Sequence, residues 1–417
     1  MEIRRAIYLD KLIRKKKNGL IKVITGVRRC GKSYLLFYLF HKHLLDSGVP
    51  ENHIIEVALD DRSNKALRDP DAMLRFIKEN IRDKEDYYII LDEVQYLNEF
   101  EDVLNSLLHI RNADVYVTGS NSKFLSSDVI TQFRGRGDEI HVYPLSFSEY
   151  VPAYQGSVDE AWDDYLIYGG MPLILTMAEP EDKAAYLNSL FQKVYISDIV
   201  ERHDVRNKVE LDELVDILAS AIGSYTNQSK LVRTFKSVKG KTISDKTIKN
   251  YIDYLIDSFL ISKAVRYDIK GKKYIGSPSK YYFEDVGLRN ARLGFRQVEQ
   301  THLMENIIYN ELRIRGYHVD VGVVEYYGVN GEGKRGKKQL EVDFVATKGS
   351  EKHYIQSAFT LPTADKVDQE QRSLLHIPDS FRKIVVVGDN IKVRRDENGI
   401  ITCLLYTSPS PRDRSVS

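Results

Sequence analysis

Eight residues near the start of the chain form a pattern typical of phosphate binding. Residues 26–33 read GVRRCGKS, which fits G-x-x-x-x-G-K-[S/T]. The glycines let backbone N–H groups turn toward a phosphate, and the start of the next helix adds a favourable dipole. Lys32 can reach β- and γ-phosphate oxygens, and the Ser33 hydroxyl can ligate Mg²⁺. The residues predicted to bind ATP are Gly26, Val27, Arg28, Arg29, Cys30, Gly31, Lys32, Ser33 and Tyr34.

Two acidic residues end an apolar segment further along the chain, where residues 87–93 read YYIILDE. Asp92 at the tip of a strand can hold the ligand shell of Mg²⁺, and Glu93 beside it can polarise an attacking water. We therefore expect Ser33 and Asp92 at the metal, and Lys32 and Glu93 in catalysis. The alternative, two solvated acids at the start of a loop, is disfavoured by the phosphate-binding pattern upstream.

Two further segments carry candidate residues. In residues 115–121 (VYVTGSN), Asn121 or Ser120 can touch the γ-phosphate and the attacking water, and we favour Asn121 as catalytic. In residues 133–137 (FRGRG), an arginine can complete the γ-phosphate site of a neighbouring subunit, and we favour Arg136. The alternative for residues 115–121 is a capped turn without a catalytic role, and the alternative for residues 133–137 is an ordinary surface charge.

Strand-like and helix-like segments alternate around these residues. The short apolar runs that predict buried parallel strands are 21–25, 54–59, 87–91 and 115–118. The segments with helical spacing of apolar residues are 32–45, 71–82 and 99–110. This alternation predicts an α/β fold with a parallel sheet, whose carboxyl edge would bring the phosphate-binding loop and the acids together.

The rest of the chain changes from a mainly helical pattern back to a mixed one. The predicted helices are 182–199, 211–222, 243–261 and 304–313. Residues 270–280 and the Gly- and Lys-rich residues 328–338 are typical of hairpins. The later predicted strands are 319–324, 340–346, 354–358 and 383–387. Residues 405–417 lack an apolar pattern and resemble translated sequencing-adapter read-through, so they are left out of the fold prediction.

The composition limits the class of protein. The chain has 417 residues, of which 42% are hydrophobic and 29% charged, so we expect two or three folded domains and exclude a disordered or fibrous chain. Its 61 Lys and Arg balance 60 Asp and Glu, so nucleic acid would need a local basic patch. Cys30 and Cys403 are too few for a disulfide framework or cysteine zinc site. We expect a cytoplasmic protein without a membrane span.

Several segments in combination resemble a known family, the prokaryotic AAA+ ATP-binding proteins that join an ATPase domain to the C-terminal domain of unknown function number 4143. The resemblance covers about residues 5–400. The segments that carry it are GVRRCGKSYLL, YIILDEVQ, VTGSNSKFLSSD, FRGRGDEIHVYPLSFSEY, YLIYGGMP, VYISDIVERH, KTIKNYIDYLIDSFLI and KYYFEDVGLRNA.

The resemblance implies a P-loop (AAA+) parallel-sheet core, then a helical and winged-helix-like region, then a restriction-endonuclease-like α/β domain. The implied boundaries are an ATPase domain at 1–155, a helical connector at 156–206, a winged-helix-like domain at 207–285, a degenerate nuclease-like domain at 286–403 and a non-native tail at 404–417. It also implies ATP and Mg²⁺ as cofactors, without a defined client.

The winged-helix-like region would place residues 243–261 as its recognition helix and residues 266–280 as its wing. Lysines around it form a local basic cluster, comprising Lys236, Lys239, Lys241, Lys246, Lys249, Lys270, Lys272 and Lys273. Such a cluster can contact DNA phosphates in a salt-sensitive manner. The alternative is a protein-docking surface whose lysines face solvent, so duplex DNA and a protein client are both possible partners. Separately, the role expected of Arg136 requires a homo-oligomer.

A nuclease of the restriction-endonuclease-like fold would need an acid on one strand and an acid-x-Lys on the next. Asp343 matches the first acid and Glu305 the helix glutamate, but the acid-x-Lys falls on Gln356 and Ala358. The missing lysine favours a degenerate fold. The leading hypothesis is therefore an ATPase coupled to C-terminal binding domains. The alternatives are a nucleotide-sensing DNA- or protein-binding module with little hydrolysis, and an ATP-gated nuclease.

Overall fold

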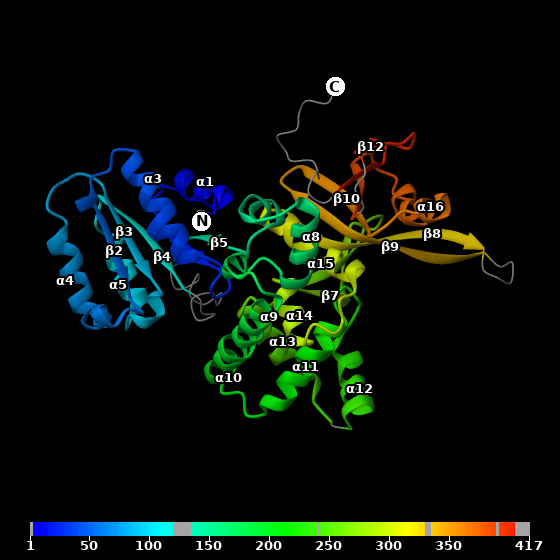
Figure 1. Ribbon diagram of the computed structural model, residues 1–417, viewed down its shortest axis with the longest axis horizontal. Helices are drawn as coiled ribbons and strands as arrows, with labels where there is room; N and C mark the ends of the chain where they lie inside the picture. Colours follow the sequence, from blue (N-terminus) through cyan, green and yellow to red (C-terminus); the bar gives the residue numbers. More distant parts are fainter. Residues whose placement is uncertain (1–2, 120–134, 241, 330–334, 389–391, 405–417) are drawn as a thin grey trace. The chain divides into compact units, whose positions relative to one another are not determined.

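The computed structural model describes residues 3–119, 135–240, 242–329, 335–388 and 392–404. The chain divides into two compact units. Unit 1 comprises Met1–Leu145, Met171–Leu175 and Asp257–Phe259, and unit 2 comprises Ser146–Gly170, Thr176–Ile256 and Leu260–Ser417. Each unit is built on its own β-sheet (Figure 1). Among the described residues, no helix combines the length and apolar character needed to cross a bilayer.

Unit 1 contains a five-stranded parallel sheet with the strand order β2-β3-β4-β1-β5. Its strands are β1 (Ile21–Thr25), β2 (Ile54–Ala58), β3 (Tyr87–Asp92), β4 (Ala113–Thr118) and β5 (Gly137–His141). The four predicted strands are confirmed. The fifth, β5, escaped prediction because it is an edge strand of mostly polar residues, GDEIH, and only Ile140 in it is buried. The sequence pattern of an edge strand is weak because one side needs no apolar cover.

The three predicted helical segments are also present. The path after the phosphate-binding loop is helical throughout, as α2 (Lys32–Tyr34), a π-helical segment (Leu35–Phe40) and α3 (His41–Asp46). Helix α4 (Pro70–Asn80) begins after Asp69, whose side chain accepts a hydrogen bond from the Ala72 N–H, and α5 spans Phe100–Leu107. The helix α1 (Ala6–Arg14) precedes β1.

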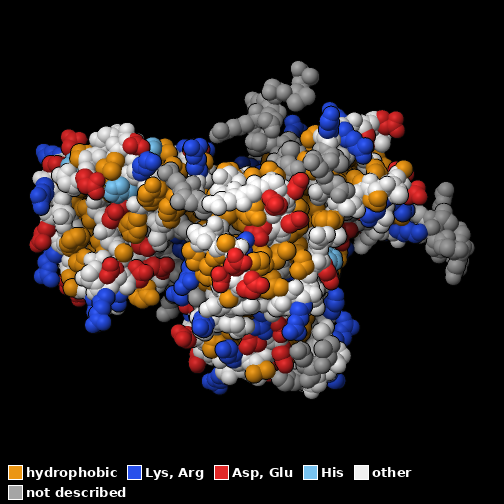
Figure 2. Space-filling model, viewed as in Figure 1, with side chains coloured by type: hydrophobic (Ala, Val, Ile, Leu, Met, Phe, Trp, Pro, Cys, Tyr) orange, Lys and Arg blue, Asp and Glu red, His pale blue; other side chains and the backbone are white. Residues whose placement is uncertain are grey.

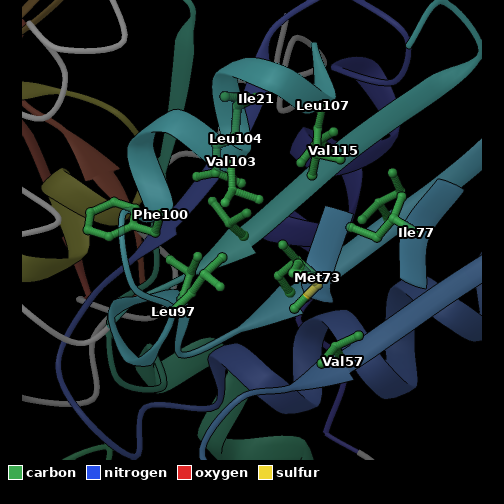
Figure 3. Packing of buried hydrophobic residues seen from close by; sticks show 14 of the residues in the cluster. Ile21, Val57, Met73, Ile77, Leu97, Phe100, Val103, Leu104, Leu107 and Val115 are labelled. Atoms are coloured by element: carbon green, nitrogen blue, oxygen red, sulfur yellow. The ribbon is translucent and has the colours of Figure 1, made fainter. Parts of the chain in front are cut away.

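Helices cover both faces of this sheet. On one face, Met73 and Ile77 of α4 and Val103, Leu104 and Leu107 of α5 pack on buried strand residues (Figure 3). On the other face, Phe40 of the π-helical segment packs against Tyr88 and Tyr116, with ring centroids 6.4 and 4.6 Å apart. Adjacent residues of β3 therefore serve opposite faces, which holds the ends of the strands in a fixed position for the loops that follow them.

Unit 2 begins with helices and continues into an eight-stranded mixed sheet. Its larger helices are α8 (Val158–Tyr168), α9 (Pro180–Leu190), α10 (Ser197–Arg202), α11 (Lys208–Ser220), α12 (Gln228–Lys239), α13 (Asp245–Asp257), α14 (Val286–Arg292), α15 (Gln300–Ile314) and α16 (Ala364–Leu375). The predicted helix over 243–261 is too long at its carboxyl end. It ends at Asp257, Phe259 has a left-handed backbone with φ of 57°, and Ile261 already begins a strand.

The sheet of unit 2 has the order β12-β13-β11-β10-β9-β8-β6-β7. Its strands are β6 (Ile261–Asp268), β7 (Lys273–Phe283), β8 (His318–Val329), β9 (Arg335–Lys348), β10 (Glu351–Ala358), β11 (Arg382–Val387), β12 (Arg394–Arg395) and β13 (Ile401–Leu404). Both predicted hairpins are present, as β6–β7 and β8–β9. Because β6 pairs with β8 in parallel, the first hairpin extends the sheet. Leu404, assigned to the tail, closes β13, whereas residues 405–417 lie outside the described residues.

The Gly169-Gly170 turn and the FEDVGL segment meet in unit 2. Asp285 caps α14 by accepting a hydrogen bond from the Leu288 N–H at 2.9 Å, and it also accepts one from the Gly170 N–H at 2.7 Å. Gly169 has φ of +70°, and a Cβ there would lie 2.4 Å from an Asp285 carboxylate oxygen. Burial raises the pKa of Asp285 to about 6, against the opposing effect of these N–H donors.

We predict that the stability of unit 2 depends on this carboxyl. Because the pKa of Asp285 is higher in the folded chain than its ordinary value of 3.8, the folded state binds the proton more tightly. Its contribution is therefore fully present below about pH 4 and declines as the pH rises to about 6. Relative to Asp285→Asn, the wild-type chain should lose stability across this window, measured as the urea midpoint of Trp162 fluorescence.

The single tryptophan lies in α8 of unit 2, so it reports this unit directly. Asp159→Asn, in the exposed first turn of the same helix, is the matched control and should leave the pH profile unchanged. The assignment would be contradicted if the wild-type chain gained stability relative to Asp285→Asn as the pH rises from 4 to 6.

Candidate functional site

The phosphate-binding loop joins β1 to α2 at the carboxyl edge of the unit 1 sheet. Two of its glycines are required by the backbone. Gly26 has φ of +136°, and a Cβ there would lie 2.0 Å from the Val142 carbonyl oxygen. Gly31 has φ of +97° and immediately precedes α2. The loop can therefore lie against the chain after β5 and still aim backbone N–H groups outward at the helix start.

The side chain of Lys32 is buried within this loop. Its ammonium donates to the carbonyl oxygens of Gly26 and Val27, both at 3.0 Å. These bonds satisfy the buried charge and keep Nζ at the centre of the loop. Phosphate oxygens compete well with neutral carbonyls for an ammonium, because bonds between two charged groups are stronger.

Three side chains meet at the carboxyl edge of the sheet. Asp92 ends β3, Thr118 ends β4, and Ser33 lies in α2 at the start of the helix after β1. Strand β4 lies between β1 and β3, so Thr118 at its end is the neighbour of Asp92 at the end of β3. The Ser33 hydroxyl donates to Asp92 Oδ2 at 2.7 Å, and the Thr118 hydroxyl donates to Asp92 Oδ1. Burial raises the pKa of Asp92, and these two donors oppose that rise.

This trio fits Mg²⁺ chemically. A serine hydroxyl and a carboxylate supply hard oxygen ligands, which Mg²⁺ prefers, and the cation commonly keeps several waters and binds substrate phosphates. A cation would also compensate the charge of a carboxylate that burial disfavours. Among the residues that the structure describes, no three His, Cys, Asp or Glu side chains are grouped to hold a metal ion by themselves. One carboxylate plus one hydroxyl therefore suits a metal that arrives with a nucleotide.

Glu93 follows Asp92 in an unusual backbone conformation. Its φ of 52° is left-handed, which costs energy for a residue with a side chain. Its N–H donates to the Thr118 hydroxyl at 2.9 Å, and its carboxylate accepts from the Gln95 amide. The turn separates the two acids, since Asp92 is buried whereas Glu93 is half-buried. Only one of the two carboxylates therefore keeps access to water.

The remaining predicted residues of unit 1 have different outcomes. Asn121 and Ser120 lie outside the described residues, so their role stays a prediction. Thr118, which the sequence analysis did not select, is the described residue at the end of β4 that contacts Asp92 and the Glu93 N–H. Arg136 lies immediately before β5, where its carbonyl accepts from the Ile21 N–H at 2.9 Å. Since β1 and β5 are parallel, Arg136 is at the amino edge of the sheet and the phosphate-binding loop is at the carboxyl edge.

Arg5 is a buried support of the loop that sequence reasoning missed. Its guanidinium donates to the carbonyl oxygens of Cys30 at 2.9 Å and Tyr143 at 2.6 Å, and it lies 4.6 Å from the centroid of the Tyr8 ring. It thus joins the loop to the segment after β5. The stretch RRAIYLDKL gives no spacing signal for such a role, because its partners are backbone carbonyls far along the chain.

In unit 2 the structure separates the nuclease-like candidates. Glu305 of α15 and Asp343 of β9 are both buried, and they are close enough for the charge of Glu305 to affect Asp343. Gln356 instead accepts a hydrogen bond from Ser373 of α16 at 3.2 Å, and Ala358 packs with Leu374 of the same helix. Gln356 and Ala358, the positions that correspond to the acid-x-Lys pair in the sequence, therefore have side chains in a different environment from that of Asp343. A lysine does accompany the acids, but it is Lys280 of β7.

The predicted lysine cluster is exposed where its side chains are described. It lies on α12, on the first half of α13, in the turn between β6 and β7 and at the first residue of β7. The exposed members are Lys236, Lys246, Lys249, Lys270, Lys272 and Lys273. The side chains of Lys239 and Lys241 lie outside the described part. Figure 2 shows both signs of charge interspersed over the visible face.

Comparison with known sequences places this geometry in a family. Residues 18–151 match the model of the AAA domain, and residues 159–299 match a domain of unknown function, number 8612, in place of the expected number 4143. An uncharacterised protein of Haemophilus influenzae is 34% identical over 392 residues, 93% of each chain. An uncharacterised protein of Methanocaldococcus jannaschii is 28% identical over 389 residues, covering 89% of this chain and 81% of its own.

Two solved structures show weaker likeness. The Aeropyrum pernix ORC1 protein in complex with DNA is 13% identical with a TM-score of 0.28, covering 70% of this chain and 92% of that chain. The Saccharomyces cerevisiae Hsp104–ADP complex is 14% identical with a TM-score of 0.29, covering 74% and 40%. The sequence matches carry the assignment: the chain belongs to the family of the Haemophilus influenzae protein and is an AAA+ family protein whose AAA domain spans residues 18–151.

Proposed function

We propose that unit 1 binds and hydrolyses ATP with Mg²⁺, and that the nucleotide state changes how unit 2 holds a partner. The observation that carries the proposal is the contact of Ser33 and Thr118 with one buried carboxylate, Asp92, beside a loop that holds Lys32. Binding alone would require only the loop. The strained Glu93 next to Asp92 adds a base with access to water, which supports hydrolysis.

Each residue has a distinct role in this proposal. Lys32 holds the β- and γ-phosphate oxygens, and Ser33 and Asp92 hold Mg²⁺, which neutralises charge on the phosphates. Glu93 accepts a proton from the attacking water. Thr118 fixes both acids, since its hydroxyl donates to Asp92 and accepts from the Glu93 N–H. Positioning and charge stabilisation then supply most of the rate enhancement.

Arg136 is proposed to act on the ATP of a neighbouring subunit. Its location at the amino edge of the sheet is remote from the loop of its own chain, which supports action between copies. A homo-oligomer is therefore part of the proposal, in which Arg136 contributes its charge to the γ-phosphate site of a neighbouring copy.

Unit 2 is proposed to read the nucleotide state through a winged-helix-like part. Three helices, α11 to α13, precede the β6–β7 hairpin, and Thr226 between the first two helices forms a bridge with Ser279 of β7. This order of elements, with exposed lysines on α12, α13 and the hairpin turn, suits duplex DNA. A protein client that binds the same face is the alternative to DNA. The relationship of this region to domain number 4143 is also part of the proposal. A low rate of ATP hydrolysis would favour the alternative that the protein senses nucleotide and binds DNA or protein with little hydrolysis.

Replacing Lys32 should weaken nucleotide binding. Lys32→Ala removes charge-assisted bonds of about 1.5–3 kcal/mol, so the Kd for ATP should rise roughly 10- to 100-fold. Fluorescence titration with a labelled ATP analogue measures this. Lys84→Ala, at an exposed position of unit 1, is the control. Unchanged affinity in a folded Lys32→Ala chain would refute the assignment of the loop.

Replacing Glu93 should separate binding from hydrolysis. Glu93→Gln keeps the size of the side chain but removes the base, so phosphate release should fall roughly 10²- to 10⁴-fold while ATP affinity is retained. Glu85→Gln, also in unit 1 and exposed, should behave as wild type. Equal phosphate release by wild type and Glu93→Gln would leave the sensor alternative as the better description.

Replacing Thr118 tests the support of the two acids. Thr118→Val keeps the shape but loses the hydroxyl that contacts Asp92 and Glu93, so kcat should fall about tenfold with a smaller change in ATP affinity. Thr118→Ser retains the hydroxyl and should restore most of the rate. If Val and Ser variants have the same kcat, the hydroxyl is not the positioning group.

A further inference from the structure

A buried ionic centre lies in unit 2, apart from any role in the proposed ATP site. Lys280 of β7 is 3% exposed, and its Nζ lies 2.8 Å from Glu305 Oε1 and 2.6 Å from Glu341 Oε1. The Tyr282 hydroxyl donates to the same Glu305 oxygen at 2.6 Å. We name the group of Lys280, Glu305, Glu341 and Asp343 the acidic centre.

Asp343 enters the acidic centre through an irregularity of β9. The pairing of β8 with β9 shifts register between Asp320 and Gly322, so one extra residue of β9 is accommodated near Asp343. Its carboxylate accepts a hydrogen bond from the Ser357 N–H at 2.8 Å and is 8% exposed. Burial and the charge of Glu305 raise the pKa of Asp343, whereas Lys280 opposes the rise.

The charges and distances describe a cation site that is already filled. Two carboxylates, those of the buried Glu305 and the partly exposed Glu341, contact one ammonium, and the charge of that ammonium also acts on Asp343. Neighbouring acids of like charge need a cation between them. The two N–O distances, 2.6 and 2.8 Å, are close to the 2.3–2.6 Å that Ca²⁺ takes to oxygen and longer than the roughly 2.0–2.1 Å of Mg²⁺. Without Nζ, a large hard cation would need only a few tenths of an ångström of adjustment.

We propose that the Lys280 ammonium is the resident cation of the acidic centre and holds the position that a hard metal ion would occupy among Glu305, Glu341 and Asp343. The native centre is then closed to metal, and unit 2 works as a binding body without a metal-dependent nuclease. Replacing Lys280 with a neutral residue opens a site for Ca²⁺ or a lanthanide. The inference goes beyond the proposed ATPase and does not depend on it.

A catalytic lysine is the competing role for Lys280. In that case the native protein would bind metal beside Lys280 and cut nucleic acid. The geometry favours the resident cation, because the ammonium lies between two acids and its side chain is sealed from solvent. The positions aligned with an acid-x-Lys pair, Gln356 and Ala358, contact α16 instead.

Terbium luminescence tests the proposal, because Tyr282 directly contacts Glu305 and can sensitise Tb³⁺ bound there. Full-length wild type, Lys280→Gln and Lys280→Arg are titrated with Tb³⁺, each carrying Asp92→Asn to remove the metal ligand expected in unit 1. Lys280→Gln should bind one Tb³⁺ at least tenfold more tightly than wild type, and Ca²⁺ should compete better than Mg²⁺. Lys280→Arg keeps the charge and should behave as wild type, as should the exposed Lys263→Gln.

Adding Glu305→Gln to Lys280→Gln should abolish the new site. The proposal is overturned if folded Lys280→Gln binds no more Tb³⁺ than wild type, or if wild type binds Tb³⁺ as tightly and loses it with Glu305→Gln. Mn²⁺-dependent nicking of a plasmid by wild type that Lys280→Gln removes would overturn it in favour of the catalytic lysine.

A folding defect in Lys280→Gln still gives an answer. Three acids without a cation should lower the urea midpoint of Trp162 fluorescence, and millimolar Ca²⁺ should raise it again in Lys280→Gln but not in wild type. A lowered midpoint that Ca²⁺ does not raise would count against the proposal as directly as a missing Tb³⁺ site.

Discussion

The Asp92 carboxylate is removed from water, and the site in unit 1 depends on how that burial is compensated. Ser33 reaches it from the start of the helix after β1, and Thr118 reaches it from the end of β4. Each donor offsets part of the cost of burying the carboxylate. The sheet order, with β4 between β1 and β3, is what brings three residues from distant parts of the chain to one carboxyl edge.

In unit 2, the partner of the buried carboxylate is a charged group instead of a neutral one. Here the acids are satisfied by a lysine from a neighbouring strand instead of by hydroxyls, and Lys280 contacts two glutamates at once. A hydroxyl can be displaced or can share a carboxylate with an arriving cation, whereas an ammonium between two acids leaves no room for one. The same residue type, a buried carboxylate, therefore suits ligand binding in one unit and closure in the other.

Much of unit 1 was predictable because its elements are locally encoded. Buried parallel strands are short continuous apolar runs, and the loop pattern of residues 26–33 has a fixed spacing, so both were found. The end of α13 and the strand β5 were missed. Phe259 takes a left-handed backbone within an apolar run that continues helical spacing, and β5 has too few apolar residues to stand out at the edge. Local periodicity carries no information on either point.

The amino-acid sequence by itself determined the phosphate-binding loop, the acids after β3 and the alternation that makes a parallel sheet, because each is a pattern within a few neighbouring residues. Only the tertiary structure decided which side chains support them. Arg5, Thr118 and Lys280 act through partners far along the chain, and Gln356 and Ala358 face α16 instead of Asp343. The physical reason is that hydrogen bonds and ion pairs in a buried site are set by strand order and register, which no short segment encodes.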